Sequence, residues 1–128
     1  MCLTLTKMSE QDTENLKKKL NKRGYIEAYK AFHKYGEEIY SPYCGNFRWM
    51  PGLNLSSRKS YILSTTERIG HEVDKGFHVF INKKDALVIS GYGDFVRKVW
   101  IKPEDLVAVG IFAGVPSAVC TKLRVRFD

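Results

Sequence analysis

DFVRKVWI occupies positions 94–101, LVAVGIF positions 106–112 and AVCTKLRVRF positions 118–127. We predict three strands here, because β-branched and aromatic residues dominate these segments and turn residues separate them. The separators are KPED at 102–105 and GVPS at 114–117. The last third of the chain is therefore expected to contribute consecutive strands to a mostly antiparallel sheet.

The last of these predicted strands alternates between an apolar and a basic face. The apolar face carries Val119, Thr121, Leu123, Val125 and Phe127, and the other face carries Lys122, Arg124 and Arg126. Cations two residues apart on one strand form a plausible phosphate-facing surface. The alternative is a solvated outer face, or a charged edge strand that discourages aggregation.

Upstream of this region the pattern predicts one more strand and two short helical segments. Gly76–Phe80 is a compact apolar strand in which successive side chains point to opposite faces. Asn82 followed by Asp85 predicts a short helix over Lys83–Ser90, and Gly91 ends it. The sequence STTER at 64–68 predicts a short helical turn.

The N-terminal region predicts a basic helix from Glu10 to Arg23. Acidic residues lie in its first turns and lysines toward its end, an order that complements the helix dipole, and Gly24 suits the left-handed terminating position. Leu16 and Leu20 give it only a narrow apolar stripe. We expect this helix to lie on the surface, or to pack against something other than its own domain.

The aromatic-rich middle of the chain predicts a hairpin followed by a rigid, turn-rich ribbon. Tyr25–Phe32 is expected to pair as a strand with Glu37–Tyr40 through a turn at Lys34–Gly36. The ribbon is Tyr40–Pro51, in which two prolines bias the preceding residues toward extended backbone. Its aromatic rings either form the wall of a small β core or contact a ligand.

The predicted fold class is α+β in a single domain spanning residues 1–128. A basic N-terminal helix occupies 1–24, and a β-rich core with a short central helix occupies 25–128. The sheet is expected to curl toward a small barrel or sandwich. A chain of 128 residues is long enough for one core of ordinary stability.

Composition indicates the cellular compartment of the protein and the charge of its binding partner. The net charge of +7 and the pI near 9.4 favour an anionic partner. The three cysteines are widely spaced, no apolar run reaches the roughly 20 residues that span a bilayer, and the N-terminus lacks a secretory signal pattern. We expect a cytoplasmic protein, in a reducing cytosol, that contacts no membrane.

Residue types point to binding rather than to catalysis. Stacking rings and guanidinium groups are what an anionic nucleotide needs, and nucleic acid is less favoured because the basic residues are scattered. The candidate ligand-binding residues are Tyr43, Arg48, Trp49, Arg58, His78, Arg124 and Arg126. No catalytic residue, metal site or cofactor is assigned, because no motif joins a nucleophile to a base and no pair of histidines or cysteines has metal-ligand spacing. Whether the protein is an enzyme stays open, and we favour the interpretation that it is not one.

Several short motifs resemble those of small, mostly uncharacterised proteins encoded by phages, prophages and their bacterial hosts. These motifs are Met1-Cys2-Leu3, Tyr29-Lys30, Ser41-Pro42-Tyr43, Trp49 with Gly52, Gly76-Phe77-His78 and Lys122-Leu123-x-Val125. In size and general character the chain is also similar to phage anti-defence sponges, such as the Thoeris anti-defence proteins, that sequester cyclic nucleotide or ADP-ribose-like signals. This analogy implies an oligomer that holds an anionic nucleotide without turning it over.

Two alternatives stay open beside this interpretation. One is a protein–protein inhibitor that binds a host defence component through its basic surface. The other is an NAD-binding enzyme, since Tyr29-Lys30, Gly76-Phe-His and Asp85-Ala86 are similar in layout to ADP-ribosyltransferase-like folds. The resemblance assigns no catalytic glutamate for that reaction.

Overall fold

The computed structural model describes the backbone of residues 3–5, 9–35, 38–40, 48–49, 52–55, 62–66, 70–73, 77–91, 94–112 and 114–126. Side chains are described over 11–34, at 39, and over 77–91, 94–112 and 114–126. The structural statements below refer to these residues.

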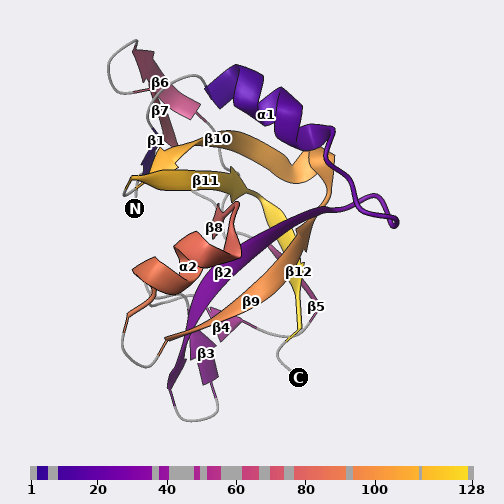
Figure 1. Cartoon of the computed structure of the whole chain (residues 1–128), viewed down its shortest axis with the longest axis vertical. Helices are drawn as coiled ribbons and strands as arrows, with labels where there is room; N and C mark the ends of the chain where they lie inside the picture. Colours follow the sequence, from indigo (N-terminus) through magenta and orange to yellow (C-terminus); the bar gives the residue numbers. More distant parts are fainter. Residues whose placement is uncertain are drawn as a thin grey trace.

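The described chain contains two helices and twelve strands, and the strands follow one another in long runs, which confirms the predicted α+β class (Figure 1). The strands of the first half are β1 (Leu3–Leu5), β2 (Ile26–Tyr35), β3 (Glu38–Tyr40), β4 (Arg48–Trp49), β5 (Gly52–Leu55), β6 (Ile62–Thr66) and β7 (Gly70–Val73). The second half contributes β8 (Phe77–Phe80), β9 (Asp94–Ile101), β10 (Leu106–Phe112), β11 (Val115–Cys120) and β12 (Lys122–Val125). The helices are α1 (Ser9–Lys17) and α2 (Lys83–Ile89), and a 3₁₀ turn, η1, covers Pro103–Asp105.

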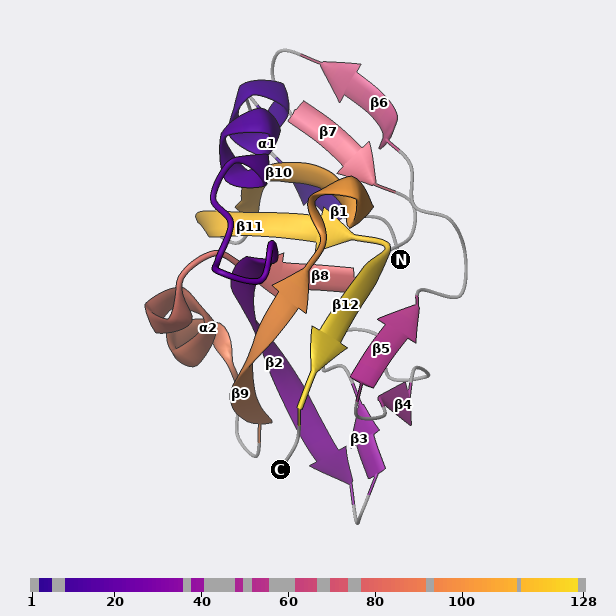
Figure 2. The same ribbon diagram turned by 90° about the vertical axis from the view of Figure 1, so that its right-hand side faces the viewer.

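The described strands form two antiparallel sheets. The larger runs in the order β10-β11-β8-β2-β9-β12-β5, with β3 and β4 continuing from the far end of β2. It curls strongly without closing, and its β10–β11 end lies across the long β2–β9 pair (Figures 1 and 2). The smaller sheet has the order β1-β7-β6 and lies beside β10. The expected curled, mainly antiparallel sheet is therefore present.

The longest uninterrupted pairing joins β2 to β9. Eight residue pairs run from Ile26 opposite Ile101 to His33 opposite Asp94. Alternate residues of both strands enter the core, where Ile26, Phe32, Val99 and Ile101 are at most 1% exposed. Side chains from β8, β10, β11 and β12 complete the same cluster: Phe77, Val79, Leu106, Val109, Ala118, Cys120, Leu123 and Val125.

Several predicted elements are confirmed nearly to the residue. Strands β9 and β10 have the predicted bounds, and α2 ends one residue before the predicted Ser90. The predicted hairpin exists as β2 and β3, with His33 opposite Tyr40, but β2 runs three residues past the predicted Phe32, so Lys34 and Tyr35 of the predicted turn are paired strand residues. In these segments local pattern and tertiary packing favour the same conformation.

The N-terminal helix differs from its prediction in length and in packing. Helix α1 ends at Lys17, and Gly24, with φ of 84°, belongs to the turn before β2 instead of terminating the helix. Leu16 is only 7% exposed and joins the main core, and the Thr13 hydroxyl accepts a hydrogen bond of 3.0 Å from the Val109 N–H of β10. The helix lies on the surface, as one of the two alternatives expected, with most of its described side chains exposed. The other alternative, packing outside its own domain, is wrong, because Leu16 and the Thr13 hydroxyl contact the core and β10.

Two other predictions are also corrected. The predicted strand over 118–127 is two strands, because the chain turns at Thr121, whose N–H donates to the Asp105 carbonyl at 2.9 Å. The predicted helical turn at 64–68 is wrong in its first half, since Ser64–Thr66 belong to β6 and pair with β7. Pairing with a neighbouring strand overrides a weak local helical signal there.

We expect Leu16→Ala to destabilise the protein by about 2–4 kcal/mol, because it removes a buried side chain that joins α1 to the core. Leu20→Ala is the matched control, because Leu20 is 49% exposed and its loss should change the free energy of unfolding by less than about 0.5 kcal/mol. Urea denaturation followed by circular dichroism measures both values. Equal effects of the two substitutions would contradict the docking of α1.

Candidate functional site

Only some of the residues that the sequence proposed as ligand contacts are described, and those do not gather in one place. Tyr43 and Arg58 lie outside the described residues, and Arg48 and Trp49 form strand β4. Arg124 and Arg126 are exposed, on β12 and directly after it, which agrees with the predicted alternation. His78 is 7% exposed on β8. Of the three candidates whose side chains the structure describes, His78, Arg124 and Arg126, only Arg124 lines the cleft described next.

A shallow cleft lies where the start of β2, the end of β9, the 3₁₀ turn and the start of β12 meet. Its volume is about 100 Å³. The residues that line it are Tyr25, Trp100, Lys102, Glu104, Asp105, Lys122, Leu123 and Arg124. Antiparallel pairing explains the convergence, because Trp100 lies opposite both Glu27 of β2 and Arg124 of β12. Residues 99 positions apart in the chain therefore line one cleft.

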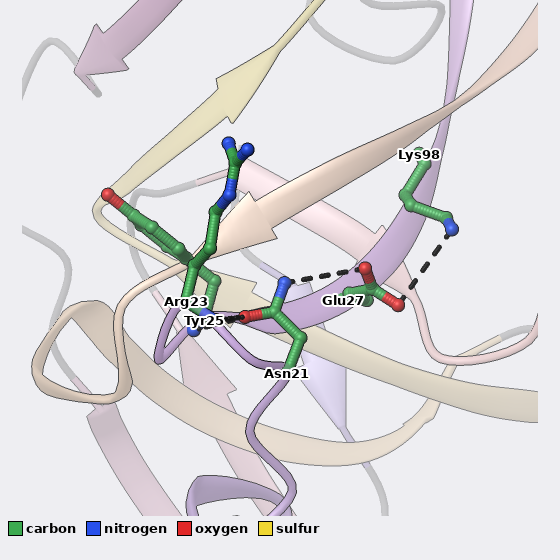
Figure 3. Close-up of polar contacts among 5 residues, drawn as sticks. All are labelled: Asn21, Arg23, Tyr25, Glu27 and Lys98. Carbon is green, nitrogen blue, oxygen red and sulfur yellow. Dashed lines mark hydrogen bonds and ion pairs between the residues drawn. The ribbon is translucent and has the colours of Figure 1, made fainter.

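Asn21 fixes the turn that brings Tyr25 to the cleft (Figure 3). Its side-chain oxygen accepts hydrogen bonds from the Arg23 and Tyr25 backbone N–H groups, both at 2.9 Å. Its own N–H donates to the Tyr25 carbonyl at 2.8 Å, and Gly24 supplies the positive φ. Figure 3 shows the Arg23 and Tyr25 side chains extending away from Asn21. The turn is thus held by its own polar contacts before any ligand arrives.

On the other side of Asn21, a pair of charged residues faces solvent. The Asn21 side-chain amide reaches a Glu27 carboxylate oxygen at 3.4 Å, and Lys98 lies 3.8 Å from the other carboxylate oxygen (Figure 3). Glu27 and Lys98 side chains are each 41% exposed, so solvent screens this ion pair and it adds little stability.

The cleft is electrostatically mixed. Three cations, Lys102, Lys122 and Arg124, share it with the carboxylates of Glu104 and Asp105. Partial burial raises the pKa of the Asp105 carboxyl group, and nearby Lys122 opposes that rise. The Arg124 guanidinium lies 5.8 Å from the centre of the Tyr25 ring, within cation–π range. The cations of such a cleft suit an anionic group, and its aromatic rings suit stacking on a flat ring of a ligand. Its carboxylates suit hydrogen bonds from ligand hydroxyl groups.

His78 belongs to a second polar group, which is buried inside the sheet. The buried Lys30 ammonium donates a 2.7 Å hydrogen bond to the His78 backbone carbonyl, and the Cys120 thiol lies 3.7 Å from the Phe77 carbonyl. The His78 ring packs edge-on against Phe80 and Phe112, and its Nε2 has no hydrogen-bond partner among the described residues. Burial, reinforced by the Lys30 charge, lowers the pKa of His78 to about 3, and burial raises the pKa of Cys120 to about 12. The His78 ring and the Cys120 thiol are therefore uncharged at neutral pH, and neither side chain lines the cleft.

Sequence reasoning missed most of the cleft residues. Tyr25 and Trp100 appeared only as members of strands, and Lys102, Glu104 and Asp105 only as a turn. A local signal existed in the KPED segment, where a lysine precedes two carboxylates between two strands. The pattern did not show that this turn meets β12 and the start of β2, because those contacts are long-range.

Comparisons with models of protein families, with curated proteins and with solved structures gave no match to the chain. Within the described ranges, neither helix has the length and apolar character needed to cross a membrane. The same ranges contain no cluster of three or more histidine, cysteine or acidic side chains arranged to hold a metal ion. The cleft geometry and the sequence resemblance are therefore the basis for a proposed function.

We expect His78 to make the protein less stable in mild acid. Below about pH 6.5 the unfolded chain protonates this histidine, whereas the folded chain keeps it neutral down to about pH 3. The free energy of unfolding should therefore fall by up to about 1.4 kcal/mol per pH unit across that window. His78→Phe suits the aromatic surroundings and should flatten the slope between pH 6 and pH 4 in urea titrations. Equal slopes for the two proteins would contradict this assignment, since carboxylate contributions are common to both.

Proposed function

We propose that the protein binds an anionic nucleotide signal, a cyclic nucleotide or an ADP-ribose derivative, and holds it without chemical change. In this proposal it acts as a phage-type anti-defence protein in the host cytosol that removes the signal from a host immune pathway. The observation that carries the proposal is the placement of Lys102, Lys122 and Arg124 beside the Tyr25 and Trp100 rings in one cleft. The phage context rests on the resemblance of the sequence motifs.

Each part of the cleft has a counterpart in such a ligand. The three cations neutralise a phosphate, and the guanidinium of Arg124 matches its oxygen atoms. Tyr25 and Trp100 offer rings for a base, and the carboxylates of Glu104 and Asp105 accept hydrogen bonds from ribose hydroxyls. The two carboxylates also discriminate against ligands that are only anionic, such as free phosphate.

The size of the cleft favours a pocket that a second subunit completes. Ligand pockets usually enclose about 300–1,000 Å³, whereas this cleft has about 100 Å³. A mononucleotide would project beyond it, and an oligomer could cover the exposed part. We therefore propose a homo-oligomer, and light scattering coupled to size-exclusion chromatography tests it.

A specific surface favours the alternative in which the protein inhibits a host protein. The segment after α1 leaves Leu20 49% exposed among the exposed cations Lys18, Lys19, Lys22 and Arg23. An exposed apolar side chain with exposed cations on both sides of it in the sequence suits an acidic protein partner. This alternative requires a stable complex with a defence protein and no affinity of the cleft for nucleotides.

Ligand release after heating separates the proposed functions. The protein is incubated with a panel of cyclic nucleotides and ADP-ribose derivatives, washed, denatured, and the released compound is identified by mass spectrometry. Sequestration predicts recovery of the intact ligand, whereas the NAD-using enzyme predicts an altered one. Recovery of no compound, with no shift in melting temperature for any member of the panel, would overturn nucleotide binding.

We expect Arg124→Gln to weaken binding of the released nucleotide at least about tenfold, since it removes the guanidinium that lines the cleft. Arg126→Gln is the matched control, because Arg126 is an exposed arginine directly after β12 that does not line the cleft. It should change the dissociation constant less than about twofold. Isothermal titration calorimetry at two salt concentrations measures both variants. Equal losses for both would indicate general charge attraction instead of a cleft contact.

A further inference from the structure

Strands β2, β9 and β12 carry aromatic and cationic side chains on one face of the larger sheet. The three strands are neighbours in that sheet (Figure 2). Residues directly opposite each other in an antiparallel pair share a face, and the register places Trp100 opposite both Glu27 of β2 and Arg124 of β12. Two positions along the same strand pair, Tyr29 lies opposite Lys98. One face of three adjacent strands therefore carries two rings and two cations beside one carboxylate.

This face points away from the core. The intervening residues Ala28, Val99 and Val125 are at most 1% exposed and belong to the main core cluster. Side chains alternate between the two faces of a strand, so the residues between these three point outward. The cations of the outward face are exposed and its rings are half-buried, so both are accessible to a ligand.

The nucleotide cleft is one end of this outward face. Lys122 is two positions before Arg124 on β12, so both side chains share the face. Lys122 and Arg124 line the cleft together with Tyr25, Trp100 and Lys102. The outward face continues beyond the cleft along β2 and β9, and the proposed binding of a single nucleotide does not use that part.

The Glu27 carboxylate in the middle of the outward face is already engaged. One of its oxygens lies 3.8 Å from the Lys98 ammonium, and the other accepts a hydrogen bond of 3.4 Å from the Asn21 amide. The carboxylates of Glu104 and Asp105 border the cleft end. The β12 side of the outward face therefore stays positively charged.

The dimensions of the outward face suit an extended polyanion. Strands are about 4.8 Å apart and residues rise about 3.3 Å along each strand, so the area from Tyr25 to Tyr29 across three strands measures roughly 13 by 10 Å. An open sheet with aromatic side chains on its face stacks two or three bases of a single strand. Lys122 and Arg124 are about 6.6 Å apart along β12, which is close to the spacing of successive phosphates in an extended single strand.

We propose that the outward face binds single-stranded nucleic acid. Bases stack on Trp100 and Tyr29, and phosphates lie beside Lys98, Lys122 and Arg124. A duplex is a poorer ligand, because its bases stack on one another and do not reach flat rings on a sheet. In the sequence these residues are scattered, which disfavoured a nucleic acid partner, and strand pairing brings them onto one face.

Binding of a single strand and sequestration of a nucleotide are separable, although both use Trp100 and Arg124. Tyr29 and Lys98 lie outside the cleft, so they contact only the longer ligand. Binding of single strands by a protein with no affinity for any nucleotide of the panel would overturn the sequestration alone. Binding of a nucleotide without binding of single strands would overturn the present proposal alone.

The test measures the fluorescence anisotropy of a labelled oligouridylate, the matching oligothymidylate and a duplex of the same length. We expect both single strands to bind more tightly than the duplex, and the ratio of their affinities identifies RNA or DNA as the better ligand. The logarithm of the binding constant should fall against the logarithm of salt concentration with a slope of about −2, since three neutralised phosphates contribute about −0.7 each.

Three variants locate the binding on the outward face. Lys98→Gln should reduce the size of the salt slope by about 0.7. Tyr29→Leu should weaken binding of the single strands at least about fivefold without changing the slope, because it removes a stacking ring and no charge. Arg97→Gln is the matched control for Lys98→Gln: Arg97 is the exposed neighbour of Lys98 on β9, and its side chain points to the other face. It should leave both affinity and slope nearly unchanged.

Thermal melts of all variants confirm folding. No binding of either single strand, or binding of the duplex as tight as that of the single strands, would overturn the proposal. Equal effects of Lys98→Gln and Arg97→Gln, together with full binding by folded Tyr29→Leu, would also overturn it and would indicate general charge attraction by a basic protein.

Discussion

The rest of the structure depends on the antiparallel pairing of β2 with β9. Eight consecutive residue pairs join these strands, and their inner faces supply several fully buried side chains of the core. The pairing also sets what lies at its two ends. At the Ile26 end it places Trp100 beside the Tyr25 turn and β12, and at the other end it places His33 against Asp94. The cleft and the His33–Asp94 contact are therefore consequences of one register, and a slip of one residue would turn their side chains to the opposite face.

Polar side chains inside the sheet differ from those at its rim in their exposure to solvent. Inside, Lys30 is 5% exposed and donates to a backbone carbonyl, while burial keeps His78 and Cys120 in their neutral forms. Desolvation is too costly there for charge to appear on the histidine or the thiol at neutral pH. At the rim, Lys102, Lys122 and Arg124 keep contact with solvent and stay available to a ligand. The same residue types thus act as structure in one place and as candidate contacts in another, and burial decides which.

Sequence patterns predicted elements well where neighbouring residues decide the conformation. Strands β9 and β10 and helix α2 follow from alternation and turn residues, and the basic face of β12 follows from its period of two. They failed at Thr121, where a hydrogen bond to Asp105 turns the chain, and at Ser64, where pairing with β7 outweighs a helical signal. They also missed the docking of α1, since the Thr13 hydroxyl that bonds to Val109 gives no apolar signal. In each failure a contact with another segment outweighed a local preference.

By itself the sequence determined the α+β class, the basic charge, the residue types suited to an anionic ligand and the alternation that exposes Arg124. Only the tertiary structure decided which of these residues meet. Tyr25 reaches Arg124, and His33 reaches Asp94, through strand pairings between segments far apart in the chain. Side-chain spacing within a strand is a local property that the order of residues encodes directly. The partner across a sheet is chosen by burial of the whole apolar surface, so no short stretch of sequence contains it.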